Sequence, residues 1–316
     1  MAGDTSSYAR RGYSEDRGGG NPEKPSSSMS GSTSGKDGLV GGREWGSQQY
    51  RYRDRDSAMY ADKSMPLETA MKGVEEADEA TDQALRCAAV VLDSDNSNRV
   101  ECECVLAKIN QWLQPSVNRQ ALPQIANSAL PSAVVKSLRK FRSEPPTAAA
   151  CCVVLNRSAG STTSAQAYLR VGALEEVGEL MDAHPAHGGI QNVTLLVLCC
   201  LMKDSGVARQ AVQIGMVPKV LRAMEATSGR EVQFNGLNAI RLLIESGRAQ
   251  RTGLQETALR AKVAHQNDDT VSTAADEVLA IVTPRFKEVL CWHWQSGWCK
   301  LGPRCTYAHG PDDLRG

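Results

Sequence analysis

An internal repeat constrains the fold of this chain more than any other feature of its sequence. The segment Gly172-Ala173-Leu174-Glu175-Glu176-Val177 is similar to Gly215-Met216-Val217-Pro218-Lys219-Val220. Each segment is followed by a strongly apolar stretch, residues 193–202 after the first and 237–244 after the second, which we expect to be helical. The offset of 43 residues between Gly172 and Gly215 is typical of stacked helical repeats. One such unit cannot cover its own apolar face, so the repeat predicts stacked units with a continuous core.

Fainter copies of the repeat begin near Ser128 and near Thr257, about one period away on either side. Towards the N-terminus, further amphipathic segments predict helices over residues 67–76, 82–92 and 99–113, although their phase within the repeat stays open. We therefore expect an all-α domain of roughly three to five units over residues 65–284.

This region resembles armadillo-repeat proteins. Their Gly-Ala-hydrophobic start, Met-x-Ala-His/Thr middle and Val-Gln final helix match the segments at Gly172 and Gly215, Met181 and Met224, and the glutamine Gln233, with Gln191 in the corresponding place. The resemblance implies an armadillo-like α-solenoid that presents a surface to a protein partner. A HEAT array or an irregular all-α domain remains an alternative.

Nuclear-import receptors of this architecture carry a ladder of Trp and Asn on the last helix of each repeat. The corresponding positions here are Leu196 and Cys200 in one repeat and Asn238 and Leu242 in the next. The ladder is absent, so we do not expect an import receptor, although a concave helical surface can still hold a protein.

Residues 1–64 are rich in Gly, Ser, Arg, Asp and Tyr and almost lack Leu, Ile and Val. Such a segment cannot bury enough apolar surface to offset its conformational entropy, and we expect it to be disordered. Arg17-Gly18-Gly19-Gly20 and the Tyr/Arg stretch at residues 50–55 resemble the arginine-rich tails of RNA-associated proteins. Neighbouring acidic residues offset the positive charge, so a solvated linker is the alternative.

Four potential metal ligands lie near the C-terminus in the order Cys291-x7-Cys299-x5-Cys305-x3-His309. Three thiolates and one imidazole complete a tetrahedral structural Zn²⁺ site and leave no open position for a catalytic water. His293 is an alternative imidazole, but a single residue separates it from Cys291, which makes joint coordination awkward.

Residues 285–316 resemble a CCCH zinc finger of the tristetraprolin and muscleblind kind, through the ligand order, Gly297 and the terminal Tyr307-Ala308-His309. The resemblance implies that the finger binds single-stranded RNA by base stacking. The matching aromatic positions are Trp294 and Tyr307, and Lys300 and Arg304 lie close enough in sequence to meet phosphate or stack on a base.

Some residues depart from this family pattern. Trp298 stands where many members carry a basic residue, and Asp312-Asp313 adds negative charge. Trp292 and Trp298 are either functional or part of the core of this small domain. A lone finger binds weakly, so affinity would need the N-terminal tail, the helical scaffold or oligomerisation.

Together these features predict a zinc-binding, RNA-associated adaptor. The alternative is a protein-protein interaction scaffold in which the finger caps the helical array, with its tryptophans packed against it. No phosphate-binding loop, nucleophile elbow or paired carboxylates are evident, so we do not expect an enzyme. Neither a secretory signal nor a membrane-spanning segment is evident, which favours an intracellular protein of the nucleus or cytoplasm.

Overall fold

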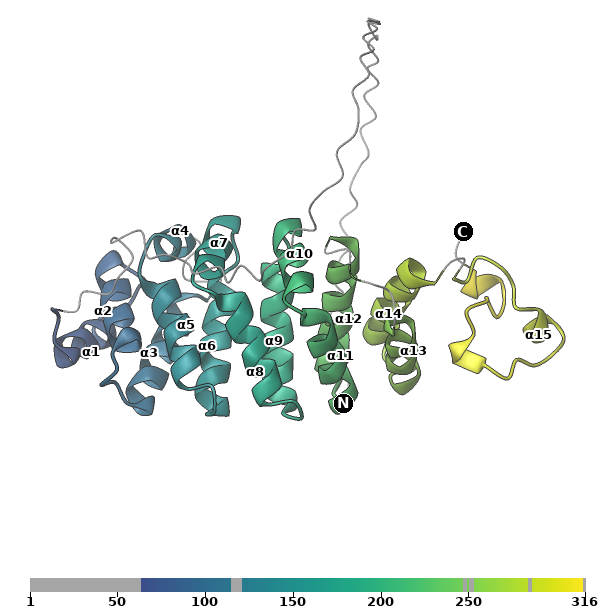
Figure 1. The fold of residues 1–316 in the computed structure, drawn as a ribbon, viewed down its shortest axis with the longest axis horizontal. Coiled ribbons are helices and arrows are strands. Elements are labelled where there is room, and N and C mark those ends of the chain that lie inside the picture. The colour runs from purple at the N-terminus through teal and green to yellow at the C-terminus, as the bar shows by residue number, and fades with distance from the viewer. Residues whose placement is uncertain (1–63, 115–120, 247–248, 250–252, 284–285, 315–316) are drawn as a thin grey trace, which may run out of the picture. The chain divides into compact units, whose positions relative to one another are not determined.

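The structure, a computed structural model, describes residues 64–114, 121–246, 249, 253–283 and 286–314 (Figure 1). Within these residues the protein is helical and contains no strand, only an isolated β-bridge. No helix among them is long and apolar enough to cross a bilayer. The predicted disorder of residues 1–64 concerns a segment that lies, except for Ser64, outside the described residues.

Fourteen α-helices make up the described part of the large helical region and precede the C-terminal segment. Their bounds are α1 Leu67–Glu75, α2 Asp82–Asp93, α3 Arg99–Trp112, α4 Ala121–Ala126, α5 Leu130–Lys140, α6 Pro145–Ser158, α7 Thr162–Arg170, α8 Ala173–Ala183, α9 Gly188–Leu201, α10 Ser205–Gln213, α11 Met216–Ala226, α12 Arg230–Glu245, α13 Leu254–Ala264 and α14 Asp269–Val282. The C-terminal segment holds α15 (Trp292–Gln295) and the short 3-10 helices η1 (Gly302–Arg304) and η2 (Pro311–Asp313).

The sequence repeat corresponds to a repeat in local structure. Gly172 precedes α8 with φ 82°, and Gly215 precedes α11 with φ 80°, a left-handed conformation that favours glycine. Gly253 adopts the same conformation before α13, at φ 78°. The third copy therefore begins at Gly253, 38 residues after Gly215, and not near Thr257. The copy expected near Ser128 corresponds to the start of α5 at Leu130.

Two buried glutamines make the same connection in successive units. The Nε2 of Gln191 in α9 donates to two carbonyls at the end of α8, at 2.9 and 2.8 Å. The Nε2 of Gln233 in α12 donates to the two corresponding carbonyls at the end of α11, both at 2.7 Å. The last carbonyls of a helix lack partners within the helix, so each glutamine joins the end of one helix to the start of the next.

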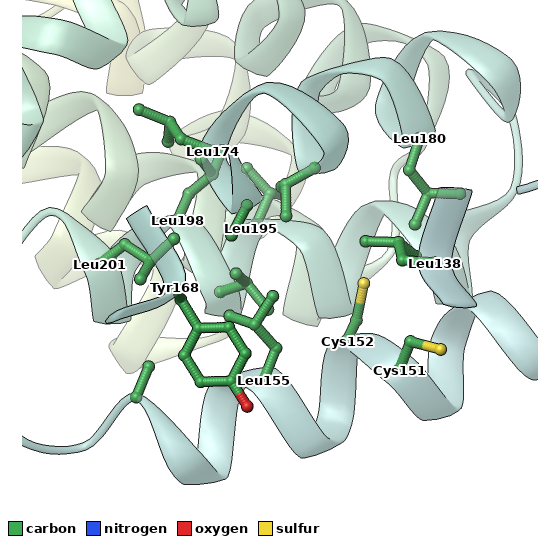
Figure 2. Packing of buried hydrophobic residues seen from close by; sticks show 14 of the residues in the cluster. Leu138, Cys151, Cys152, Leu155, Tyr168, Leu174, Leu180, Leu195, Leu198 and Leu201 are labelled. Atoms are coloured by element: carbon green, nitrogen blue, oxygen red, sulfur yellow. The ribbon is translucent and has the colours of Figure 1, made fainter. Parts of the chain in front are cut away.

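Helices in equivalent positions pack against one another from unit to unit. The helices α3, α6, α9, α12 and α14 form one series of neighbours, and α2, α5, α8, α11 and α13 form a second. The core between them is shown in Figure 2, where Tyr168 lies near Leu155, and Cys152 lies near Leu138. Burial raises the pKa of Cys152 to about 12, so this cysteine is a neutral thiol of the core.

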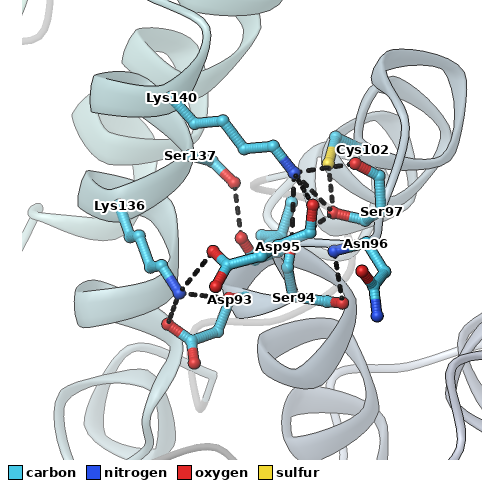
Figure 3. A network of polar contacts seen from close by, with 10 residues as sticks. Asp93, Ser94, Asp95, Asn96, Ser97, Cys102, Lys136, Ser137 and Lys140 are labelled. Atoms are coloured by element: carbon cyan, nitrogen blue, oxygen red, sulfur yellow. Dashed lines mark hydrogen bonds and ion pairs between the residues drawn. The ribbon is translucent and has the colours of Figure 1, made fainter.

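Lysines of α5 tie the first units together at their polar edge (Figure 3). The ammonium group of Lys140 donates to the carbonyls of Ser94, Asp95 and Ser97 in the turn between α2 and α3, at 3.1, 3.1 and 2.7 Å. Lys136, one turn earlier, forms ion pairs with Asp93 and Asp95. These contacts cover backbone carbonyls that would otherwise need water, and they fix the turn against α5.

Candidate metal centre

Backbone pairing brings the first and last ligands of the C-terminal segment together. Leu290 and Ala308 form an isolated parallel bridge. Within it, the backbone N–H of Cys291 donates to the carbonyl of Ala308 at 2.7 Å, and the N–H of Ala308 donates to the carbonyl of Val289 at 2.9 Å. Cys291 and His309, far apart in the motif, are thereby placed side by side.

Two tight turns bring the remaining ligands to the same point. Gly297 lies between α15 and Cys299 with φ 105°, and Gly302 opens η1, which leads into Cys305, with φ 48°. Side chains rarely adopt these positive φ angles, so glycine is required at both turns. The turns that the sequence predicted at Gly297 and at Gly302-Pro303 are therefore present.

The four predicted ligands converge. One donor atom from each of Cys291, Cys299, Cys305 and His309 lies within 4.8 Å of the other three. The sulfurs of Cys291 and Cys305 are 3.6 Å apart, close to the roughly 3.8 Å edge of a tetrahedron with Zn–S bonds of about 2.3 Å. His293 is exposed and does not belong to this group.

The donor set also fits a cation chemically. The Nε2 of His309 is buried and has no hydrogen-bond partner among the described residues, a costly state for a ring nitrogen unless a metal takes its lone pair. Burial lowers the pKa of His309, and nearby Lys287 lowers it further, so the imidazole is neutral and able to coordinate at pH 7. The residues present therefore fit a closed zinc site.

The thiols beside it show why a cation is needed. Burial raises the pKa of Cys305 to about 11. Burial also opposes ionisation of Cys291, but backbone hydrogen bonds at Trp294 and His293 and side-chain hydrogen bonds from Cys305 and Cys299 outweigh it and lower the pKa of Cys291. Without a cation, the hydrogen bonds around the site thus favour the thiolate of Cys291, whereas Cys305 keeps its proton. A divalent ion removes this competition because it favours every thiolate that it binds.

A buried ion pair between Lys287 and Asp313 holds the backbone of the ligand His309. Lys287, with φ 59° and 4% exposure, donates from Nζ to Asp313 Oδ2 at 2.6 Å and to the carbonyl of Tyr307 at 3.0 Å. Asp313 Oδ2 accepts a second hydrogen bond from the backbone N–H of His309 at 2.7 Å. The negative charge of Asp313 is therefore neutralised within the segment. This pair was not predicted from the sequence, because its partners are 26 residues apart.

The aromatic residues of the segment differ in their surroundings. The ring of Trp294 stacks on the ring of His309, with centroids 4.7 Å apart and planes 8° from parallel. One face of Trp294 therefore orients the imidazole ligand. Trp292 and Trp298 are 71% and 68% exposed, so the suggestion that they form a core, or pack against the helical array, is wrong. Tyr307 is also half exposed.

The two predicted basic residues lie on the surface of the same segment. Lys300 directly follows the ligand Cys299, and Arg304 directly precedes the ligand Cys305. Both side chains are exposed. The basic side chains and the exposed aromatic rings thus lie together on the surface of one small segment.

Comparison with protein families agrees with this geometry. Residues 286–311 match the family described as zinc finger C-x8-C-x5-C-x3-H type (and similar). This chain has seven residues between the first two cysteines instead of eight. No curated protein and no solved structure matches the chain significantly. The chain thus carries a CCCH zinc finger at residues 286–311, with a Cys3His cluster suited to Zn²⁺, beside a large all-helical region.

Proposed function

We propose that this protein is an RNA-associated adaptor. The CCCH finger contacts single-stranded RNA, and the helical region, an armadillo-like solenoid, presents a surface to a protein partner. The adaptor acts inside the cell and has no catalytic activity of its own.

The observation that carries the RNA proposal is the concentration of exposed aromatic side chains in the finger. Nine large hydrophobic residues are exposed among those described, and four of them are aromatic rings of the finger: Trp292, Trp294, Trp298 and Tyr307. Exposed aromatic rings are unfavourable in water unless a partner covers them, and rings of this kind are the surfaces on which unpaired bases stack.

The charge of the same surface suits a polyanion. Residues 289–311 contain no Asp or Glu, whereas Lys300 and Arg304 contribute positive charge. Asp313, just beyond, is held by Lys287. Phosphate groups can therefore approach the rings without meeting a carboxylate from this stretch.

The structure changes the expected division of roles among the aromatic residues. Trp294 uses one face on His309, which leaves its other face for a base. Trp298, for which the family pattern suggested a basic residue, is more exposed than either Trp294 or Tyr307. We therefore add Trp298 to the proposed stacking residues, which are Trp294, Tyr307 and Trp298, with Lys300 and Arg304 as phosphate contacts.

Tyr307→Ala and Trp298→Ala are expected to weaken binding of single-stranded RNA oligonucleotides by roughly 5- to 150-fold each, because each stacked base contributes about 1–3 kcal/mol. Affinities are measured by fluorescence anisotropy on the full chain, with zinc content determined for every variant. Leu314→Ala, an exposed but non-aromatic change just beyond the finger, is the control and should bind normally.

Unchanged affinity in both variants, with zinc retained, would favour the alternative function, a scaffold in which the finger is purely structural. The dependence of binding on salt concentration distinguishes the RNA-binding function from the scaffold function. Binding driven by phosphate contacts weakens as salt rises, whereas affinity that is insensitive to salt contradicts the role of Lys300 and Arg304.

The repeated helical pairs support the proposal of a protein partner. Successive units share the left-handed glycine and the buried glutamine, as stacked repeats do. Leu196 on α9 is exposed, and Val100 is the other exposed large hydrophobic residue described in the helical region. We place the partner surface along α9 and its neighbours α6 and α12.

A further inference from the structure

The stretch that enters the finger is anchored on two sides. After α14 ends at Val282, the backbone N–H of Phe286 donates to the carbonyl of Thr283 at 3.2 Å, which turns the chain back. Phe286 is 3% exposed and belongs to the hydrophobic core of the helical region, separate from the cysteine cluster of the finger. Its neighbour Lys287 is buried inside the finger instead.

On the helical side, α13 and α14 contact the stretch that enters the finger. Lys262 of α13 lies 5.9 Å from the centre of the Phe286 ring, a cation–π distance, and is held there by a 2.6 Å ion pair with Asp276 of α14. The 3-10 helix η1 of the finger, which leads into the ligand Cys305, also packs against α13. The last helical pair is therefore covered by the finger segment.

On the finger side, hydrogen bonds connect this stretch to the metal ligands. The backbone N–H of Lys287 donates to the carbonyl of Thr306 at 2.7 Å, between the last two ligands in sequence. Its ammonium group holds Asp313, which in turn accepts the backbone N–H of the ligand His309. Phe286 is thus one residue away from a hydrogen-bonded network that ends at the zinc site.

We propose that the zinc site has a second function: metal binding stabilises α13 and α14 through Phe286, so that the finger is a metal-dependent cap of the helical region. The finger has little core of its own beyond its three cysteines, so its order depends on the metal. Without zinc, the hydrogen bonds that Lys287 makes with the finger are lost, and Phe286 is released from the core. The end of the array then loses its cover, which a stack of helical units needs.

This function is independent of RNA binding, and it differs from the cap considered for the alternative scaffold, because Phe286 and η1 make the contact and the tryptophans do not. The coupling is reciprocal, since any link by which zinc stabilises α13 and α14 must also make zinc binding depend on their packing.

Hydrogen-exchange mass spectrometry on the full chain tests the proposal. Removal of zinc by a chelator, or the substitution Cys305→Ser, should speed amide exchange in α13 and α14 about tenfold or more and leave α1 to α3 unchanged. Phe286→Ala should show faster exchange even with zinc present, and chelation should then add much less in α13 and α14 than it does in the wild type, because only η1 still links α13 to the finger.

Val289→Ala is the control, since Val289 lies in the same stretch but its side chain is half exposed; this variant should respond to chelation as the wild type does. Loss of zinc affinity in Phe286→Ala would show the same coupling from the other side and would support the proposal. Exchange in α13 and α14 that is identical with and without zinc in the wild type overturns it, and so does a Phe286→Ala variant that responds to chelation there as strongly as the wild type.

Discussion

Replacing Cys305 by serine is expected to deprive the protein of zinc and to unfold most of the finger. A serine hydroxyl is a far poorer ligand than a thiolate, and the three remaining donors leave the tetrahedron incomplete. The free energy of structural zinc binding is large, about 10–16 kcal/mol for finger peptides at pH 7, and in such small domains it is also the free energy of folding. The cysteine cluster offers no apolar core to replace it.

Metal content by mass spectrometry and tryptophan fluorescence measure the two parts of this expectation. Wild-type protein should hold one zinc per chain, and Cys305→Ser essentially none. Three of the five tryptophans lie in the finger, so their emission should report its unfolding. Cys104→Ser is the matched control, because Cys104 is exposed on α3 and lies outside the ligand cluster. Stoichiometric zinc in the Cys305→Ser protein would show that the cluster is not the metal site.

Acid should release the zinc for the same reason. Protons compete with the metal for the thiolates, and because burial raises the pKa of Cys305 to about 11, this thiol holds its proton strongly. Metal affinity therefore falls as the pH is lowered, and the proton released on binding makes the dependence measurable by titration at several pH values.

The ligands of this site were predictable from sequence because they are close in the chain and their spacing alone brings them together. What supports them was not predictable to the same degree. The stacking of Trp294 on His309 and the Lys287–Asp313 pair join residues 15 and 26 positions apart, and they depend on how the backbone bridge at Leu290 and Ala308 folds. No local spacing rule identifies such partners.

The helical region shows a similar division. The helices predicted over residues 67–76, 82–92 and 99–113 are confirmed as α1, α2 and α3, because apolar periodicity is a strong local signal. The phase of the last copy was wrong: it begins at Gly253. The left-handed glycine that precedes α8, α11 and α13 is a property of the backbone, and the step from Gly215 to Gly253 is 38 residues instead of the 43 between Gly172 and Gly215. The short helices α7 and α10 were not predicted, since nine residues give little periodicity.

Trp112→Ala is expected to destabilise the helical region by about 3–5 kcal/mol, the usual cost of truncating a fully buried aromatic side chain. Trp112 is 0% exposed at the end of α3, and its indole Nε1–H donates to the carbonyl of Ala77 at 3.2 Å. The substitution therefore leaves a cavity and also leaves that carbonyl without its donor. Urea denaturation followed by circular dichroism at the helical band measures the change.

Trp292→Ala provides the comparison within the same chain, because this tryptophan is 71% exposed on the finger. An exposed substitution away from caps and buried contacts usually changes stability by less than about 0.5 kcal/mol. The same substitution should thus have different effects on stability at the two sites, because Trp112 is needed for folding and Trp292 is not. Equal destabilisation by the two substitutions would show that Trp292 is packed in solution, and would remove the exposed aromatic surface on which the RNA proposal depends.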